Sequence, residues 1–245
     1  SKRDTSNGVV YGSGVKVTDT NISVGKSDKE LSGTINVAGI AVTNTGTISG
    51  VTVKGTKDTV AIKVAASNTA ANASIAGAVV GNYGTLYNVY VSFVQGSEGI
   101  KAAGTFAAKV AGLAVVTKSK VSNSYVSANI TAYTGNGNTQ AAGLVVDVVE
   151  SGYVEYCGFY GNNKTIEAHT VAGLAVTLSQ SAPRKIAING WDAAWNTIKL
   201  TTSKSDMGNG VVQCFITGDS VVKGKSVAGL VYSVSNGAVI DSYVG

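Results

Sequence analysis

The chain has 245 residues, of which 31 are glycine, one is proline and only 13% are charged. This composition is too apolar for a disordered chain and too poor in charge for a long-helix protein. No apolar run reaches the roughly 18 residues that a membrane-spanning helix needs, so we expect no membrane span. The net charge of +5 comes from basic residues scattered along the chain, so we expect no specific nucleic-acid partner and at most a weak preference for acidic surfaces or glycans.

The first 36 residues lack the repeat found downstream, and we expect them to form an atypical N-terminal coil or cap of a single domain covering residues 1–245. Their opening, SKRDTSNGVVYG, contains no apolar core of a signal peptide. It is typical of a mature terminus or of a boundary within a longer protein.

From residue 37 onwards an Ala-Gly-(Leu/Ile/Ala) triplet recurs. Its glycines lie 30 to 38 residues apart, except for a last gap of 56 that is close to two periods. A period of this length predicts a solenoid. The repeat glycines are Gly39, Gly77, Gly112, Gly143, Gly173 and Gly229.

A second pattern follows each triplet: an aliphatic residue, two residues, a small residue, one residue, and an aliphatic or aromatic residue. Leu86/Val89/Val91 is one example, and the small residue falls at positions 51, 89, 124, 157, 214 and 242. A weaker match at Ile186/Asn189/Trp191 fills the long gap and predicts a further coil there. That coil overlaps residues 179–197, which we expect to be an irregular, loop-rich insertion. A third, weaker segment closes most coils, for example ANITAYT.

These segments are short, rich in Val, Ile, Thr and Tyr, and separated by Gly, Asn and Ser turns, which indicates strands. Three strands in about 30 residues suit one turn of a parallel β-helix, in which each strand pairs with its equivalent one coil along, at about 4.8 Å. We predict an all-β fold, a right-handed parallel β-helix (β-solenoid) of about seven to eight coils of roughly 25–38 residues, about 35 Å long.

The triplet (V/A)AGL followed by SNGAVIDSYV or KSKVSNSYVS resembles the GLUG-motif repeats of bacterial cell-surface proteins. These repeats occur in adhesins and in accessory regions of immunoglobulin A peptidases. The resemblance covers roughly residues 37–245, although this chain has alanine where that family tends to have a second glycine. It implies a structural or adhesive surface module and transfers no catalytic residue.

Both faces of the segment around each repeat glycine are apolar. Ala142, Leu144 and Val146 have the parity of an inward core face. The opposite parity, which should be polar, carries no charge in any coil. Either the glycine bends the strand so that both sets point inward, or the second set is a stripe covered by a neighbouring protomer, domain or loop. The candidate packing stripe is Val79, Ala114, Val145, Ala175 and Val231.

Catalysis would require carboxylates, of which the chain has 14. The densest group, Asp147, Glu150 and Glu155, offers an acid and a base for glycan chemistry. We favour the alternative that these groups are simply solvated around a turn. His169 is the sole histidine, so we expect no His-centred metal site. We also expect no catalytic residue and no cofactor.

Cys157 and Cys214 occupy the small-residue position of the second pattern, with Asn189 between them. Two coils would separate them by about 9.6 Å, beyond the limit of about 7 Å between α-carbons for a disulfide. We therefore expect free, buried thiols.

The residue after the small position should point outward. In four coils it is aromatic: Tyr90, Tyr125, Phe215 and Tyr243. Such residues can grip sugar rings, but an aromatic ladder that stabilises the stack is the interpretation we favour.

From these patterns we expect a non-enzymatic, extracellular structural or adhesive module of a cell-surface protein, with a surface glycan, a host protein or itself as partner. The terminal DSYVG stops on a strand without the polar cap of a solenoid end. A self-assembling filament subunit that stacks end to end is therefore the first alternative, and a glycan-active enzyme is the second.

Overall fold

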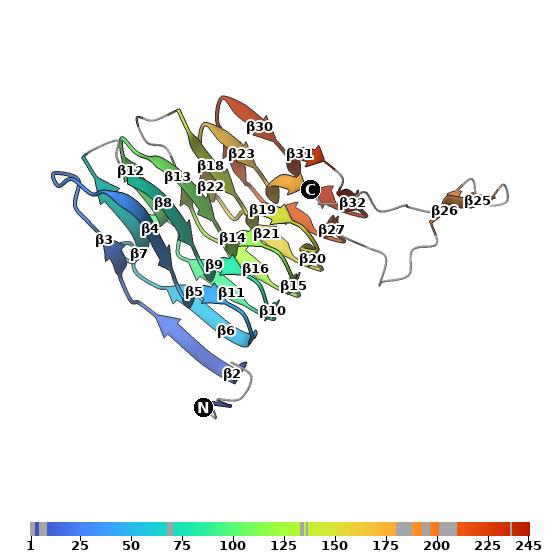
Figure 1. The fold of residues 1–245 in the computed structure, drawn as a ribbon, viewed down its shortest axis with the longest axis horizontal. Helices are drawn as coiled ribbons and strands as arrows, with labels where there is room; N and C mark the ends of the chain where they lie inside the picture. Colours follow the sequence, from blue (N-terminus) through green and yellow to red (C-terminus); the bar gives the residue numbers. More distant parts are fainter. Residues whose placement is uncertain are drawn as a thin grey trace.

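The computed structural model describes residues 3–4, 9–67, 71–132, 135, 137–179, 188–192, 197–200, 210–235 and 237–245. All regular elements in these segments are β-strands, and most of them stack in parallel, coil upon coil (Figure 1). The predicted fold class, a parallel β-solenoid, is confirmed. Four stacked sheets, here called A to D, surround the core.

Sheet A begins with β2 (Val9–Thr18) and β6 (Thr47–Gly55), and β1 (Arg3–Asp4) pairs with β2 in an antiparallel manner. Each later coil contributes two short strands to this sheet. The first of each pair is β10 (Thr85–Tyr87), β15 (Lys120–Ser122), β20 (Tyr153–Glu155), β27 (Gly210–Val212) or β32 (Ala238–Ile240). The second is β11 (Tyr90–Phe93), β16 (Tyr125–Ser127), β21 (Gly158–Tyr160), β28 (Phe215–Thr217) or β33 (Tyr243–Val244).

The other sheets have one strand per coil. Sheet B holds β3 (Ile22–Val24), β7 (Ala61–Ala66), β12 (Gly99–Gly104), β17 (Ile130–Thr131), β22 (Thr165–Glu167) and β29 (Val221–Lys223). Sheet C holds β4 (Gly33–Ala38), β8 (Ala71–Ala76), β13 (Ala107–Ala111), β18 (Thr139–Ala142), β23 (Thr170–Ala172) and β30 (Ser226–Ala228). Sheet D holds β5 (Ala41–Asn44), β9 (Val79–Asn82), β14 (Ala114–Thr117), β19 (Val145–Val149), β24 (Ala175–Ser179) and β31 (Val231–Ser235).

The three segments predicted for each coil correspond to sheet A, to sheet B and to sheets C and D together. Two of the three segments bend in the middle, so each appears as two strands. Sheet A has seven rungs, from β2 to the pair β32 and β33. Sheets B, C and D have six rungs each, because β32 and β33 have no counterparts in them. The atypical N-terminal segment thus contributes the first coil of the stack.

The coil predicted at Ile186/Asn189/Trp191 was wrong. Asn189 and Trp191 lie in β25 (Ile188–Asp192), which pairs with β26 (Thr197–Leu200) in an antiparallel manner, and Ile186 lies outside the described residues. Strand β20 pairs directly with β27, matching Val154 to Val211. A six-residue pattern with only three specified positions recurs by chance, and here it fell in a segment that is not part of the stack.

The core consists of columns of like residues, one from each coil. Sheet B shows this clearly, because in-register pairing places one aliphatic side chain above the next along its whole length. Its central column is Ile22, Ile62, Ile100, Ile130, Ile166 and Val222. Each coil therefore buries its apolar residues mainly against its two neighbours, as in other solenoids.

The bend in sheet A depends on one residue per coil with a left-handed backbone. Its φ is positive in all six of the coils from β6 onwards, between 47° and 67°. These residues are Gly50, Asn88, Asn123, Tyr156, Gln213 and Asp241. Glycine, asparagine and aspartate adopt this conformation easily, whereas Tyr156 and Gln213 adopt it at some energetic cost. The small residue of the second pattern comes directly after the bend.

The repeat glycines form the bend between sheets C and D, where no side chain fits. A Cβ on Gly143 would overlap the carbonyl oxygen of Gly173 one coil along, and the same overlap recurs from Gly39 to Gly173. These glycines lie on six consecutive coils, because β23 pairs directly with β30 across the long sequence gap. The contact explains why the triplet is the most regular feature of the sequence.

The candidate packing stripe is not a surface. Val79, Ala114, Val145 and Ala175 are fully buried in the main core, and Val231 packs against it. The covered-stripe interpretation is therefore wrong for these residues, and the corner interpretation is correct for them, because they point into the core of their own chain. The bend carries both sides of the strand into buried positions within a single chain.

The prediction that Ala142, Leu144 and Val146 point into the core was only partly correct. Leu144 lies in the main core, but Ala142 and Val146 belong to a second buried cluster. On β13 the core residue Val110 alternates with Lys109 and Ala111, so the second cluster lies on the outer side of the bend. Its buried members are Ala76, Ala111, Val115, Ala142, Val146, Ala172 and Val176. Sheets C and D thus fold towards each other and bury a small apolar patch on their outer side.

Candidate functional site

The carboxylates that suggested catalysis do not converge on one site. Each forms an ion pair with a lysine of the preceding coil. Asp147 Oδ2 lies 2.6 Å from Lys109 Nζ, Glu150 Oε1 lies 2.6 Å from Lys118 Nζ, and Glu155 Oε1 lies 2.7 Å from Lys120 Nζ. The hydrogen bond to the Glu155 carboxylate raises the pKa of Lys120. These pairs join neighbouring coils, as Lys63 and Glu98 also do.

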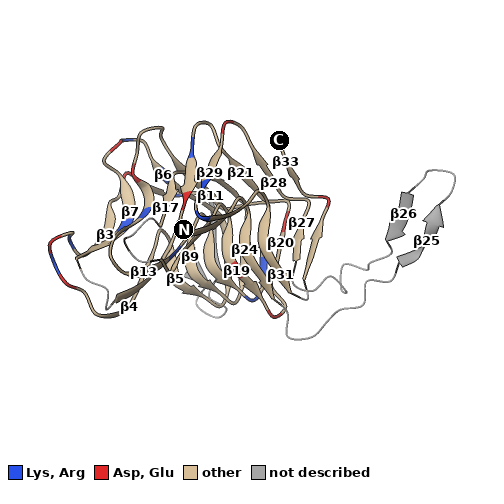
Figure 2. Ribbon diagram, turned by 90° about the horizontal axis from the view of Figure 1, so that it is seen from above, with Lys and Arg blue, Asp and Glu red and all other residues tan. Residues whose placement is uncertain are grey.

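The charged residues are dispersed over the coils and their connecting turns (Figure 2). Within the described part of the chain, no group of three His, Cys, Asp or Glu side chains is placed to hold a metal ion. His169 has its backbone N–H bonded to Thr139 Oγ1 at 3.0 Å, and its backbone carbonyl accepts hydrogen bonds from Lys225 and Ser226. The backbone of this residue therefore links successive coils.

The two cysteines are free and buried, and they lie on adjacent coils. The predicted spacing of two coils was wrong, because Asn189 does not belong to the stack. One coil, about 4.8 Å, falls within the α-carbon range of disulfides, so distance is not what keeps the thiols free. Burial raises the pKa of Cys157, which keeps this side chain in the unreactive thiol form.

A hydrogen-bond ladder explains why serine and cysteine share this position. Ser124 Oγ donates to the Ser122 carbonyl at 2.9 Å and accepts the Val89 N–H of the preceding coil at 3.1 Å. Cys157 Sγ accepts the Ser124 N–H at 3.4 Å in the same way, and Ser242 Oγ accepts the Cys214 N–H at 3.1 Å. The position is therefore structural: Val51 and Val89 fill it in the earlier coils without a side-chain hydrogen bond, whereas Ser124, Cys157 and Ser242 both donate and accept there.

The predicted aromatic pairs are present, and they join into one ladder on the outer face of sheet A. The ring centroids of Tyr90 and Tyr125 lie 5.5 Å apart, and those of Phe215 and Tyr243 lie 5.8 Å apart. Gly158 occupies the rung between the two pairs. The Phe215 ring leans over this glycine and comes to 6.1 Å from Tyr125, so the ladder is continuous. Tyr160 flanks it, with centroids 5.7 Å from Tyr125 and 5.2 Å from Phe215.

The orientation of the rings favours a structural role for the ladder. Tyr90 is inclined to Tyr125 by 30°, and Phe215 to Tyr243 by 21°, so the rings turn much of their faces towards one another. Stacking on a sugar ring needs an exposed aromatic face. Desolvation in this row also raises the pKa of Tyr125. The ladder therefore connects neighbouring coils.

The C-terminal end of the stack exposes residues that are buried in every inner coil. Val211 is 1% exposed, whereas Val239, one coil along in the same column, is 38% exposed. Ile216 and Val244 differ more, at 2% and 58%, and Leu178 and Val234 differ similarly, at 0% and 50%. The described residues thus present an open apolar cross-section at this end.

No protein-family model matches the chain, and no curated protein or solved structure is significantly similar to it. The resemblance to GLUG-motif repeats therefore stays a prediction. Among the described residues, no helix has the length and apolar character needed to cross a membrane.

Proposed function

We propose that the chain is a non-enzymatic structural module of an extracellular or cell-surface protein, a rigid β-solenoid spacer whose outer faces are available for adhesion. The observation that carries this proposal is the use made of its ionisable side chains. Asp147, Glu150 and Glu155 each form an ion pair with a lysine on a neighbouring coil. The aromatic ladder and the Ser/Cys ladder likewise connect coil to coil, as a load-bearing stack requires.

An assay for polysaccharide cleavage tests the non-enzymatic part. The purified chain, incubated with a panel of neutral and acidic polysaccharides, should release no new reducing ends. Glu155→Gln and Glu98→Gln form a matched pair, because each removes a carboxylate that is paired with lysine. If the wild type cleaves a polysaccharide, and if Glu155→Gln abolishes this cleavage whereas Glu98→Gln retains it, the chain is an enzyme and the proposal is overturned.

The open apolar end favours a second candidate, the subunit of an extracellular filament. We rank this candidate below the spacer, because the ion pairs and ladders described above connect coils within one chain.

Negative-stain electron microscopy across a concentration series separates these two candidates. The spacer predicts short rods, with a stack about 35 Å long, at every concentration. Long uniform fibres that form from the pure chain would instead establish the filament.

A further inference from the structure

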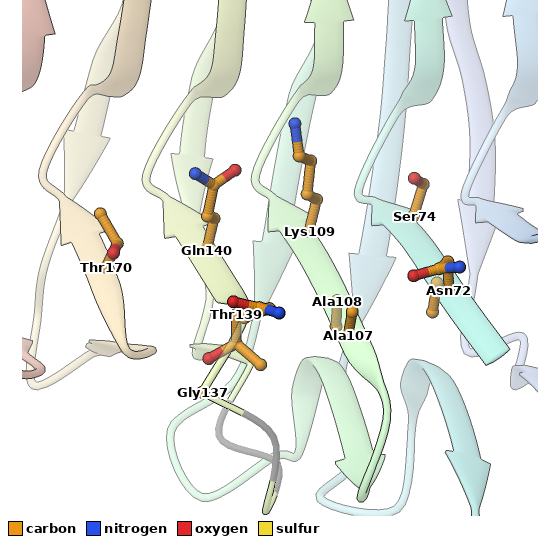
Figure 3. A pocket seen from close by; sticks show the side chains of 11 residues that line it. Asn72, Ser74, Ala107, Ala108, Lys109, Gly137, Thr139, Gln140 and Thr170 are labelled. Carbon is orange, nitrogen blue, oxygen red and sulfur yellow. The ribbon is translucent and has the colours of Figure 1, made fainter. Parts of the chain in front are cut away.

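A groove of about 500 Å³ lies on the outer face of sheet C, away from the aromatic ladder on sheet A (Figure 3). Strands β8, β13, β18 and β23 form its floor, and residues 137–138 border it. Its volume falls in the range of ligand sites in proteins, about 300–1,000 Å³. No residue in its lining is aromatic or acidic, and Lys109 is its only cation.

In-register pairing arranges the lining in two rows. The first row crosses four strands and contains Ser74, Lys109, Gln140 and Thr170. In the second row Ala107 pairs with Asn72. On its other side Ala107 lies level with Asn138, because the next residues along, Ala108 and Thr139, are paired. Because alanine is short, the second row has a notch between two amide side chains.

The polar groups in the groove are mainly uncharged. Lys109 is neutralised by Asp147, at 2.6 Å. Gln140 Oε1 is shielded from solvent and has no hydrogen-bond partner in the structure. A buried acceptor without a donor destabilises the folded chain, and rotation of the Gln140 side chain into the groove would let it accept a hydrogen bond from a ligand hydroxyl.

The backbone beneath the groove restricts the kind of ligand. Strands β8, β13 and β18 are each paired on both sides, so none offers a free edge to which a peptide strand could add. Recognition must therefore come from side-chain amides and hydroxyls. Such groups, spaced along a flat row, match a ligand that carries many neutral hydroxyls.

We propose that this groove binds a neutral oligosaccharide. The ligand would lie across sheet C. One of its hydroxyls would donate a hydrogen bond to Gln140 Oε1, and others would exchange hydrogen bonds with Asn72, Ser74 and Thr170. Part of one sugar ring would fill the notch above Ala107. This inference deepens the adhesive part of the proposed function and rests on it.

Calorimetric titration with neutral tetrasaccharides of the gluco-, manno-, xylo- and galacto-series tests the proposal. At least one should bind saturably, with similar affinity at about 0.05 and 0.5 M NaCl, because uncharged contacts are not screened. Ala107→Trp fills the notch and should weaken that binding about tenfold or more. Gln140→Ala should weaken it several-fold.

Ala103→Trp is the matched control. Ala103 lies in the same coil, partly exposed on sheet B, outside the groove. It should leave binding unchanged, and circular dichroism should show both tryptophan variants folded. The inference is overturned if no neutral tetrasaccharide binds, if Ala107→Trp leaves binding intact, or if only tetragalacturonate binds and is lost at high salt. The proposed function is tested separately by the cleavage assay, so the two can fail independently.

Discussion

The inner coils and the last coil use nearly the same residues with different results. Leu144 and Leu230 follow equivalent repeat glycines, yet Leu144 is fully buried and Leu230 only partly. Gly143 and Gly229 are also equivalent, but only Gly143 would meet a backbone carbonyl if it carried a side chain. The difference shows that a coil is buried by its neighbours and not by its own sequence, so the same substitution should have very different effects at the two places.

The glycine pair should give the largest contrast. Gly143→Ala places a Cβ against the carbonyl oxygen of Gly173, so either the two coils separate or the bend distorts. We expect a loss of at least about 3 kcal/mol in unfolding free energy. At Gly229 the added Cβ would meet only Val244 Cγ2, at 3.2 Å, and the loss should stay below about 1 kcal/mol. Urea denaturation of both variants is the measurement, and equal losses would contradict the account of the bend.

Truncation of the equivalent leucines should give the next largest contrast. Leu144→Ala leaves a cavity in a closed core and should reduce unfolding free energy by about 2–5 kcal/mol. Leu230→Ala removes a side chain that is already partly exposed, and we expect less than about 2 kcal/mol. Thermal denaturation followed by circular dichroism can compare them directly. A larger effect for Leu230 would mean that the end of the stack is covered in solution.

The serines of the corner ladder provide a subtler comparison. Ser124→Ala removes the acceptor of a buried Val89 N–H and should lower unfolding free energy by about 1–3 kcal/mol. Ser242 makes the same pair of bonds in a part-buried position, so Ser242→Ala should have an effect of about 1 kcal/mol or less. Ser124→Cys is the control, because the inner coils already accept cysteine at this position, and it should retain most of the stability.

The smallest expected effect is on the unfolding free energy at acidic pH. Hydrogen bonds from Lys63 and Lys101 hold the pKa of Glu98 below its ordinary value of 4.5. Since the carboxylate is favoured in the folded chain, its contribution is present above about pH 4.5 and is lost as the pH falls through the lowered pKa. Glu98 is partly exposed, so the contribution should be under about 1 kcal/mol and should shrink at 0.5 M salt. The stability of the wild type relative to Glu98→Gln, measured from about pH 7 down to pH 3, should decline only at the acid end.

The repeating parts of the fold could be predicted because strict columns leave clear sequence signals. The triplet glycines and the small corner residue each obey one local requirement coil after coil, and the outward aromatics do so in four coils. The residue before the corner was missed, because Gly50, Asn88 and Tyr156 share a backbone angle and no side-chain chemistry. The faces at the sheet C and D bend were partly misassigned, because Ala142 and Val146 are apolar on a side that ordinary alternation makes polar.

The groove could not be foreseen for a different reason. It depends on which side chains become neighbours across four strands, and on a short residue, Ala107, being placed between longer ones. Register of this kind follows from the stack and not from any single segment. The ion pairs of the carboxylates could not be predicted for the same reason. Each carboxylate is paired with a lysine one coil away: Asp147 with Lys109, Glu150 with Lys118, and Glu155 with Lys120.

The direct pairing of β20 with β27 has a practical consequence. The chain leaves the fifth coil after Ser179 and rejoins the sixth at Gly210, in the register that an uninterrupted repeat would have. The entropy of closing a connection between two fixed ends grows only logarithmically with its length. This connection is therefore a natural place to graft a foreign domain, such as a fluorescent protein or an antibody fragment, while the solenoid on either side folds as before.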